Sequence, residues 1–204
     1  MVHRRGRVVA LSLTLWLSTS SCSLSRDYPI KHLYGLDVER PASDTATPVD
    51  AVYLRVAHFR ASPGCDSVAL VYRRSEQEYA ADFYHEFFRP PAQLVEQETR
   101  EWLSRTQRFS SVLPAGSHVM TPWTLEGHIG AIYGDFRAAN APHAVLELTL
   151  LLLRERDGEL TIERQREYRE SEPIPAATPE AVVAGLRLAL ARILTRFEAD
   201  LAGA

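Results

Sequence analysis

The stretch Ala144–Glu170, AVLELTLLLLRERDGELTIERQREYRE, decides the fold. Its first half is β-prone and strongly apolar around Leu148–Leu153, which predicts a central strand covered on both faces of a sheet. The dipeptide Asp157-Gly158 then supplies a strong signal for a two-residue hairpin turn. We therefore predict a long hairpin, in which Glu159–Glu170 returns alongside Ala144–Arg154.

A helical pattern follows the hairpin. Thr178 can cap the helix, Pro179 suits its first position, and Glu180 favours the positive helix end. Apolar residues at three- and four-residue steps then predict a helix of about twenty-three residues packed on a sheet. These residues are Val182, Leu186, Ala189, Leu190, Ile193, Phe197 and Leu201. The same stripe can instead bind a membrane or a partner helix, but core packing is the preferred interpretation.

The remaining segments predict further strands and one more helix. Strands are expected over Ile30–Val38, Ala51–Ala61, Ser67–Arg73, Glu78–Phe88, Phe109–Leu113 and Trp123–Phe136, and a helix over Ala92–Arg108 behind Pro90 and Pro91. In that helix Leu94, Val95, Trp102 and Leu103 can share one face. The order of strands, helix, strands and helix predicts an α+β fold. We expect a single domain, with a largely antiparallel or mixed β-sheet and two main helices packed on one of its faces.

Residues 1–22 have the layout of an export signal. A basic start between His3 and Arg7 precedes an apolar run, Val8–Leu17, and small residues lead to Cys22. The apolar run is about ten residues long, whereas a permanent transmembrane helix needs about twenty. The pattern predicts a signal peptide over residues 1–21, a tether over 22–28 and the folded domain over 29–204.

Cys22 is the predicted lipid-attachment residue. Ser20 and Ser21 match the motif that precedes the lipidated cysteine of bacterial lipoproteins, whereas Thr19 stands where leucine is usual. The alternative is ordinary signal-peptidase cleavage, which leaves Cys22 a free thiol. Ser23, in place of the aspartate typical of inner-membrane retention, favours the periplasmic face of the outer membrane. Lipidation leaves Cys65 without an intrachain partner, so that it is either a buried thiol or part of an intermolecular bond.

The composition and motifs argue against several functions. The formal net charge is −3 and becomes more acidic once the basic leader is removed, so we expect no nucleic-acid partner. His58, His85, His118, His128 and His143 stand far apart, and no His-Glu-x-x-His, Cys-x-x-Cys, Gly-x-Ser-x-Gly or phosphate-binding loop occurs. We expect no metal, no cofactor and no catalytic residue. An envelope hydrolase with a dispersed active site and a cell-wall or assembly scaffold remain alternatives.

Aromatic residues gather in one segment. Tyr79, Phe83, Tyr84, Phe87 and Phe88 lie within ten positions. Core aromatics on a strand leading into a helix are the preferred interpretation. The alternative is that Phe87, Phe88 and the prolines after them form a surface for a partner or a lipid.

Several segments from Val52 to the final helix resemble one family. They are Tyr53-Leu54-Arg55-Val56, Ser67-Val68-Ala69-Leu70-Val71-Tyr72-Arg73, Asp82-Phe83-Tyr84, Pro91-Ala92-Gln93-Leu94 and Leu125-Glu126-Gly127. Together they resemble the ABC-type transport auxiliary lipoprotein family, also called the PqiC family. Phe87 and Phe88 stand where that family commonly has a tryptophan near the proline.

The resemblance implies a role in transport. Proteins of this kind are lipoproteins of the outer membrane that accompany an ABC transporter and a substrate-binding MCE-domain protein in moving lipids across the envelope. It therefore implies a non-enzymatic periplasmic subunit with these two partners, held to the membrane through Cys22. A homo-oligomer is compatible with such a role.

Overall fold

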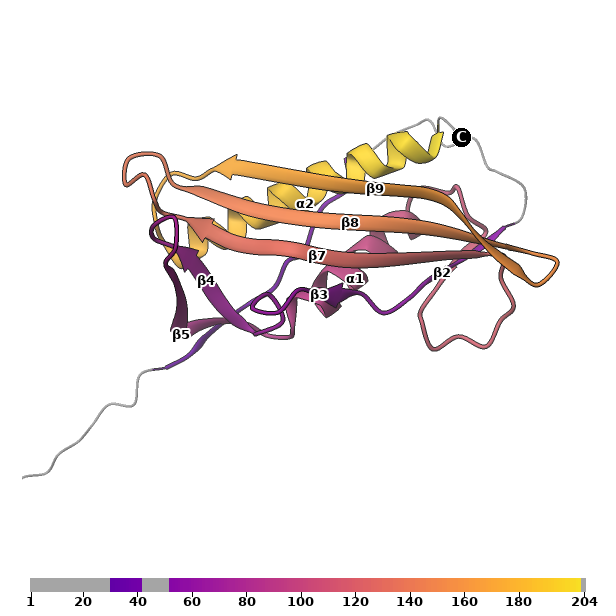
Figure 1. Cartoon of the computed structure of the whole chain (residues 1–204), viewed down its shortest axis with the longest axis horizontal. Coiled ribbons are helices and arrows are strands. Elements are labelled where there is room, and N and C mark those ends of the chain that lie inside the picture. Colours follow the sequence, from indigo (N-terminus) through magenta and orange to yellow (C-terminus); the bar gives the residue numbers. More distant parts are fainter. Residues whose placement is uncertain (1–29, 42–51, 203–204) are drawn as a thin grey trace, which may run out of the picture.

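The structure, a computed structural model, describes residues 30–41 and 52–202 (Figure 1). The expected signal peptide, Cys22 and the tether lie outside these residues. The strands are β1 (His32–Tyr34), β2 (Tyr53–Val56), β3 (Arg60–Ala61), β4 (Ala69–Arg73), β5 (Tyr79–Phe87), β6 (Ser111–Leu113), β7 (Trp123–Asp135), β8 (His143–Arg156) and β9 (Glu159–Pro173), and the helices are α1 (Pro91–Ser104) and α2 (Pro179–Ala202). All nine strands of the described ranges join one mixed sheet, which confirms the predicted single α+β domain.

Strand β7 organises the sheet. One of its edges pairs with β8 in antiparallel fashion over almost its whole length. The other edge pairs in parallel fashion with β2, then β3, then β4. Strand β5 continues this side beyond β4, and β1 adds a short parallel strand at the edge.

The segment predicted as one strand over Ala51–Ala61 is broken into β2 and β3. The break occurs at Phe59, whose backbone N–H donates to Glu96 of α1 at 3.1 Å and not to β7. The Phe59 ring covers Gly127 of β7 so closely that a Cβ atom on Gly127 would lie 2.4 Å from it. Phe59 therefore leaves the ladder in order to pack into the core.

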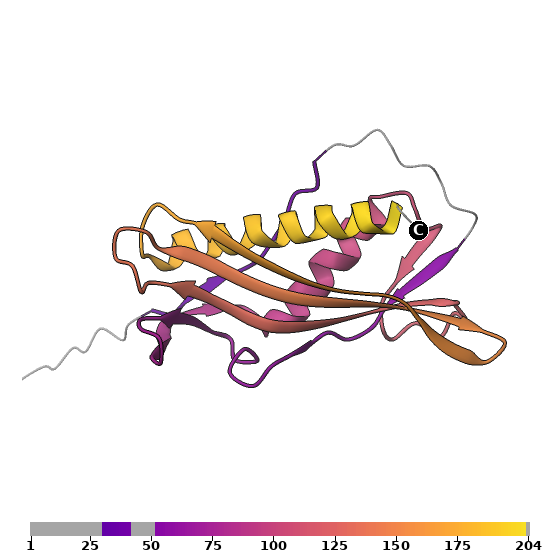
Figure 2. The same ribbon diagram turned by 45° about the horizontal axis from the view of Figure 1, so that its top comes forward.

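The β8–β9 hairpin is present as predicted. Asp157 and Gly158 have φ angles of 53° and 81°, the left-handed values that a tight hairpin turn of this class requires. The prediction that β8 is covered on both faces was wrong, because both helices lie on the same face of the sheet (Figure 2). On the opposite face Glu147, Thr149 and Leu151 are only half-buried.

The core lies between the sheet and the two helices. The residues predicted for one face of α1 are all buried, and those of α2 are buried except for the half-buried Leu201. Thr178 caps α2, since its Oγ1 accepts the backbone N–H of Ala181 at 3.3 Å. A Cβ atom on Gly185 would lie 2.6 Å from both Ala144 of β8 and Ile174, so this glycine permits the close approach of helix and sheet. In the described part of the chain, no helix is long and apolar enough to cross a membrane.

Candidate docking surface at the N-terminal end

Four of the five clustered aromatic residues lie at the surface. Tyr79 is 52% exposed, Phe83 70%, Tyr84 41% and Phe88 46%, whereas Phe87 is buried. The preferred prediction, that these residues are core aromatics, therefore holds for Phe87 alone. Of the residues named by the alternative of a partner or lipid surface, Phe88 is exposed, whereas Phe87 and Pro91 are buried.

A bulge in β5 brings Phe83 and Tyr84 to the surface. Ala69 of β4 pairs with Glu86, and Val71 pairs with Ala81, so residues 82–85 lie opposite Leu70 alone. The extra residues leave the ladder and the strand bends locally. Phe83 and Tyr84 form the centre of this bulge, and their rings contact each other edge to face with centroids 5.1 Å apart.

Asp82 holds the bulge through four hydrogen bonds. Its Oδ1 accepts the backbone N–H groups of Tyr84 at 2.8 Å and of His85 at 3.1 Å. Its Oδ2 accepts the hydroxyl of Tyr72 at 2.8 Å and lies 3.0 Å from Nδ1 of His85. The carboxylate thus satisfies backbone donors that the bulge removes from the ladder, and it links them to β4.

The ionisation of this cluster follows from these contacts. Burial alone raises the pKa of Asp82, but the hydrogen bonds from Tyr84, Tyr72 and His85 outweigh it, and the net pKa is lowered. Burial, followed by the contact with Asp82, raises the pKa of Tyr72 well above its ordinary value. Asp82 is therefore a carboxylate and Tyr72 a neutral donor at neutral pH.

Strand β1 ties the bulge to α2. The rings of His32 and His85 stack with centroids 5.0 Å apart. The Tyr34 hydroxyl donates to Glu180 in the first turn of α2 at 2.8 Å. Burial and this hydrogen bond raise the pKa of Tyr34 to about 12. The bulge is therefore anchored on β1, β4 and the start of α2.

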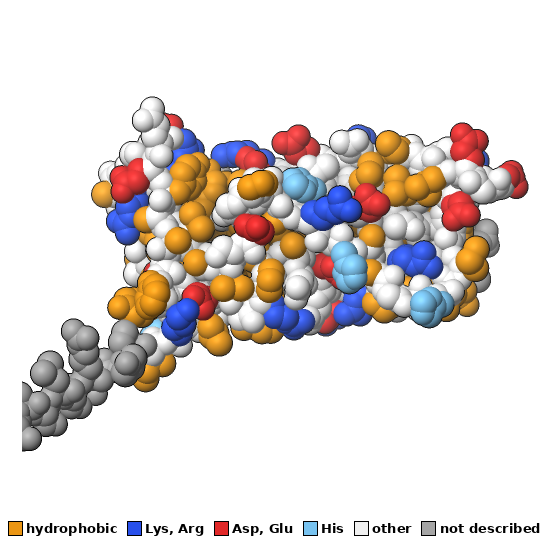
Figure 3. Space-filling model, turned by 60° about the horizontal axis from the view of Figure 1, so that its bottom comes forward, with side chains coloured by type: hydrophobic (Ala, Val, Ile, Leu, Met, Phe, Trp, Pro, Cys, Tyr) orange, Lys and Arg blue, Asp and Glu red, His pale blue; other side chains and the backbone are white. Residues whose placement is uncertain are grey.

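Exposed apolar side chains lie on and beside the bulge, and we call this group the aromatic end patch. It consists of Ile30, Leu33, Phe83, Tyr84 and Phe88, all at least 41% exposed. The Lys31 ammonium lies 5.2 Å from the Phe83 ring centroid, and the Arg89 guanidinium 4.6 Å from that of Phe88. Hydrophobic side chains gather where the N-terminal segment enters the domain (Figure 3). The Lys31 ammonium also forms an ion pair with Glu86 at 2.5 Å, so the patch is apolar and is bordered by this ion pair and by Arg89.

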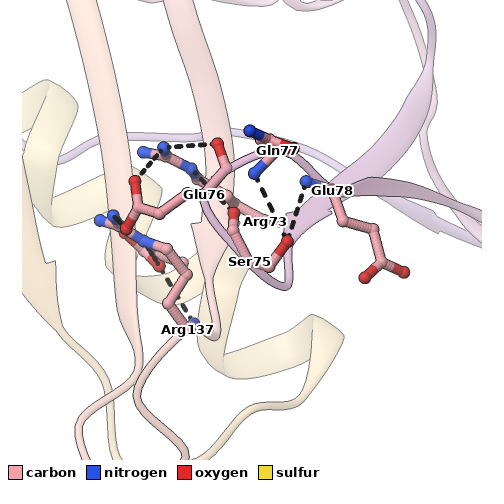
Figure 4. A network of polar contacts seen from close by, with 7 residues as sticks. Arg73, Ser75, Glu76, Gln77, Glu78 and Arg137 are labelled. Carbon is pink, nitrogen blue, oxygen red and sulfur yellow. Dashed lines mark hydrogen bonds and ion pairs between the residues drawn. The ribbon is translucent and has the colours of Figure 1, made fainter.

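A polar network borders the same end of the sheet (Figure 4). Arg137 donates to Asp135 at 2.7 Å and to Glu76 at 2.5 Å, and Glu76 also accepts from Arg73 at 2.9 Å. The hydrogen bonds from Arg137 lower the pKa of Asp135. This network joins the β4–β5 turn to the end of β7.

A second group of exposed apolar residues lies at the opposite end of the long hairpin. The backbone N–H of Glu155 donates to Pro122 at 2.8 Å, so the loop before β7 lies beside the hairpin tip. We call this group the distal patch, and it consists of Tyr53, Val119, Met120, Leu160 and Ile162. The domain therefore has exposed apolar residues at both ends of its long axis.

One arrangement bears on the hydrolase alternative. Ser62 Oγ lies 3.0 Å from Nε2 of His128, beside a cavity of about 430 Å³ on the face of the sheet without helices. In the described residues no carboxylate hydrogen-bonds to His128; the histidines that contact carboxylates are His58 and His85. A serine–histidine pair is present, but within residues 30–41 and 52–202 the carboxylate of a catalytic triad does not join it.

The other candidate residues are placed as follows. No group of three or more His, Cys, Asp or Glu residues in the described ranges is arranged to hold a metal ion. Cys65 is half-buried, and its thiol donates to the carbonyl of Gly130 at 3.7 Å. Cys22 lies outside the described residues, so its lipidation remains a prediction.

Comparisons with known proteins identify a family from the sequence and a fold from solved structures. A family model described as ABC-type transport auxiliary lipoprotein component matches residues 34–197. A search of curated proteins gave no match. Protein XCC0632 from Xanthomonas campestris, a DUF330 protein, is similar with a TM-score of 0.70 and 19% identity over 81% of this chain and 92% of that chain. An uncharacterized protein has a TM-score of 0.65 and 16% identity over 84% of this chain and 99% of that one. At these identities the two structures establish a common fold.

Proposed function

The chain belongs to the family of ABC-type transport auxiliary lipoprotein components, and from this premise we propose its specific role. It is a non-enzymatic periplasmic subunit of an ABC/MCE-type system that moves lipids or hydrophobic solutes across the cell envelope. Cys22 anchors it to the periplasmic face of the outer membrane, and its domain binds the MCE-domain protein. The observation that carries this proposal is the family match over residues 34–197.

The two exposed ends of the domain fit a linking role. In the sequence the proposed tether precedes Ile30, a member of the aromatic end patch, so this end of the domain is the one joined to the proposed anchor. The distal patch lies at the other end of a hairpin whose β8 strand has 14 residues and spans about 47 Å. We therefore assign the distal patch to the MCE-domain partner, because it can extend away from the anchored end.

Affinity purification from detergent-solubilised envelopes tests the proposal. The full-length protein with a C-terminal tag should recover an MCE-domain protein and ABC transporter subunits. Recovery of neither would refute the transport role, and recovery of cell-wall proteins instead would support the scaffold alternative. Mass spectrometry of the mature N-terminus tests the anchor separately, since a diacylglyceryl group on Cys22 is expected.

Variants of exposed residues locate the partner surface. Met120→Ser and Ile162→Ser remove apolar area from the distal patch, at side chains that are 83% and 63% exposed. We expect their combination to reduce recovery of the MCE-domain protein at least fivefold. Leu188→Ser on α2 is the matched control, because Leu188 is 57% exposed and outside both patches. Undiminished recovery with the double variant would contradict the assignment.

A further inference from the structure

We infer that the aromatic end patch rests on the surface of a lipid bilayer and gives the domain a second membrane contact beside the acyl chains of Cys22. This inference rests on the proposed anchoring of Cys22. It adds a defined orientation, since the β5 bulge would face the membrane and the hairpin tip would extend away from it.

The length of the tether supports a bilayer as the occupant. Ile30 is both the first described residue and a member of the patch. Eight peptide steps separate it from Cys22, and a chain of this length reaches about 28 Å at most. The patch is therefore held close to the lipid surface, where even a weak contact is favoured by its high effective concentration.

The side chains of the patch match the interfacial zone of a membrane. Tyrosine is enriched at the level of the headgroups, and phenylalanine and leucine side chains insert at the boundary between headgroups and acyl chains. Phe83 and Tyr84 provide the aromatic groups at the tip of the bulge, with Lys31 next to the Phe83 ring. Arg89 occupies the same position relative to Phe88.

The rigidity of the bulge argues that its exposure has a function. The Asp82 carboxylate, the buried Tyr72 and the stacked His85 fix the backbone on both sides of Phe83. A flexible loop could turn its aromatic rings back onto the domain. This bulge instead presents them to the outside, as an apolar contact with another phase requires.

Fluorescence quenching by brominated lipids tests the inference. The full-length lipidated protein carrying Phe83→Trp is reconstituted into vesicles of phosphatidylethanolamine and phosphatidylglycerol, with or without bromine on the acyl chains. After subtraction of the wild-type signal from Trp102 and Trp123, bromine should reduce the emission of the new indole at least twofold. Leu188→Trp is the matched control and should keep its emission, because Leu188 lies on α2 outside the patch.

The outcomes separate this inference from the proposed function. If Phe83→Trp protein floats with the vesicles and is as insensitive to bromine as Leu188→Trp protein, the membrane contact is refuted while the anchor stands. If wild-type protein fails to float and mass spectrometry finds no lipid on Cys22, the anchor itself is refuted. A blue-shifted but unquenched emission with cross-linked dimers would identify a second copy of the chain as the occupant, which also overturns the inference.

Discussion

Replacing Asp82 by alanine should destabilise the domain while leaving its apolar core intact. The substitution removes a carboxylate that is 16% exposed and accepts hydrogen bonds from Tyr72, Tyr84 and His85. No buried apolar group is lost. Any change in stability therefore reports on the polar support of the β5 bulge.

The hydrogen bonds set the expected magnitude. Asp82→Ala orphans the Tyr72 hydroxyl, in a residue that is only 5% exposed, together with two backbone N–H groups. Each lost bond costs about 1 kcal/mol, which gives a loss of about 3 kcal/mol in the free energy of unfolding. Asp82→Asn keeps an oxygen for the two N–H groups but removes the charged contacts of Oδ2. We therefore expect its free energy of unfolding to fall by about 1 kcal/mol.

Urea unfolding monitored by circular dichroism measures both variants. At pH 7 we expect the free energy of unfolding to decrease in the order wild type, Asp82→Asn, Asp82→Ala. Because the pKa of Asp82 is lowered in the folded state, its stabilising effect is present above the ordinary carboxyl pKa of about 3.9 and is lost as the pH falls through the folded value. The difference in the free energy of unfolding between wild type and Asp82→Asn should therefore disappear in acid. An Asp82→Ala protein within about 0.5 kcal/mol of wild type would refute the role given to this carboxylate.

Three further predictions concern other parts of the fold. Gly185→Ala should lower stability by about 1–2 kcal/mol in thermal unfolding, because the new methyl group collides with Ala144 and Ile174. The cost of this collision exceeds the gain in helix propensity, so a stabilised variant would contradict the prediction. Glu76→Gln should change stability by less than about 1 kcal/mol in urea, since the Glu76 side chain is 75% exposed and its ion pairs are screened, and a larger loss would show a stronger network. Burial raises the pKa of the Cys65 thiol, so iodoacetamide at pH 8 should alkylate it several-fold more slowly in the folded protein than in urea, and equal rates would contradict its partial burial.

The elements that depend on local sequence were predictable. The turn at Asp157-Gly158 requires two left-handed residues, and few dipeptides adopt them as readily. The long helix α2 was predictable for a similar reason, since its cap at Thr178 and its apolar stripe are both encoded within one segment.

The parallel pairings along β7 were harder to predict from the sequence, because they join distant segments. The predicted strand over Ile30–Val38 shortens to β1 once Val38 donates its N–H to Glu98 of α1 and not to a strand. This contact joins residues far apart in the chain. Neither partner is identifiable from local periodicity.

The sequence contains an indication of the β5 bulge that the preferred interpretation of the aromatic residues did not use. Asp82 interrupts an aromatic segment, and aspartate often accepts the backbone N–H groups that follow it within two or three residues. An aspartate at this position therefore indicates a local departure from the strand. Recognising it would have favoured exposure of Phe83 and Tyr84.

The outer strands β1 and β9 differ in where their exposed apolar residues lie. Strand β9 pairs only with β8, and most of its length carries charged residues, a common means of preventing edge-to-edge association; its exposed apolar residues, Leu160 and Ile162, lie near the hairpin tip in the distal patch. At the other side β1 is equally accessible, yet Leu33 and the neighbouring Phe83 remain 61% and 70% exposed. On β9 the exposed apolar residues are thus confined to the hairpin tip, whereas on β1 they adjoin the bulge of β5. The inferred membrane contact accounts for the exposure of the aromatic end patch, because the anchor proposed at Cys22 would bring a membrane within reach of β1.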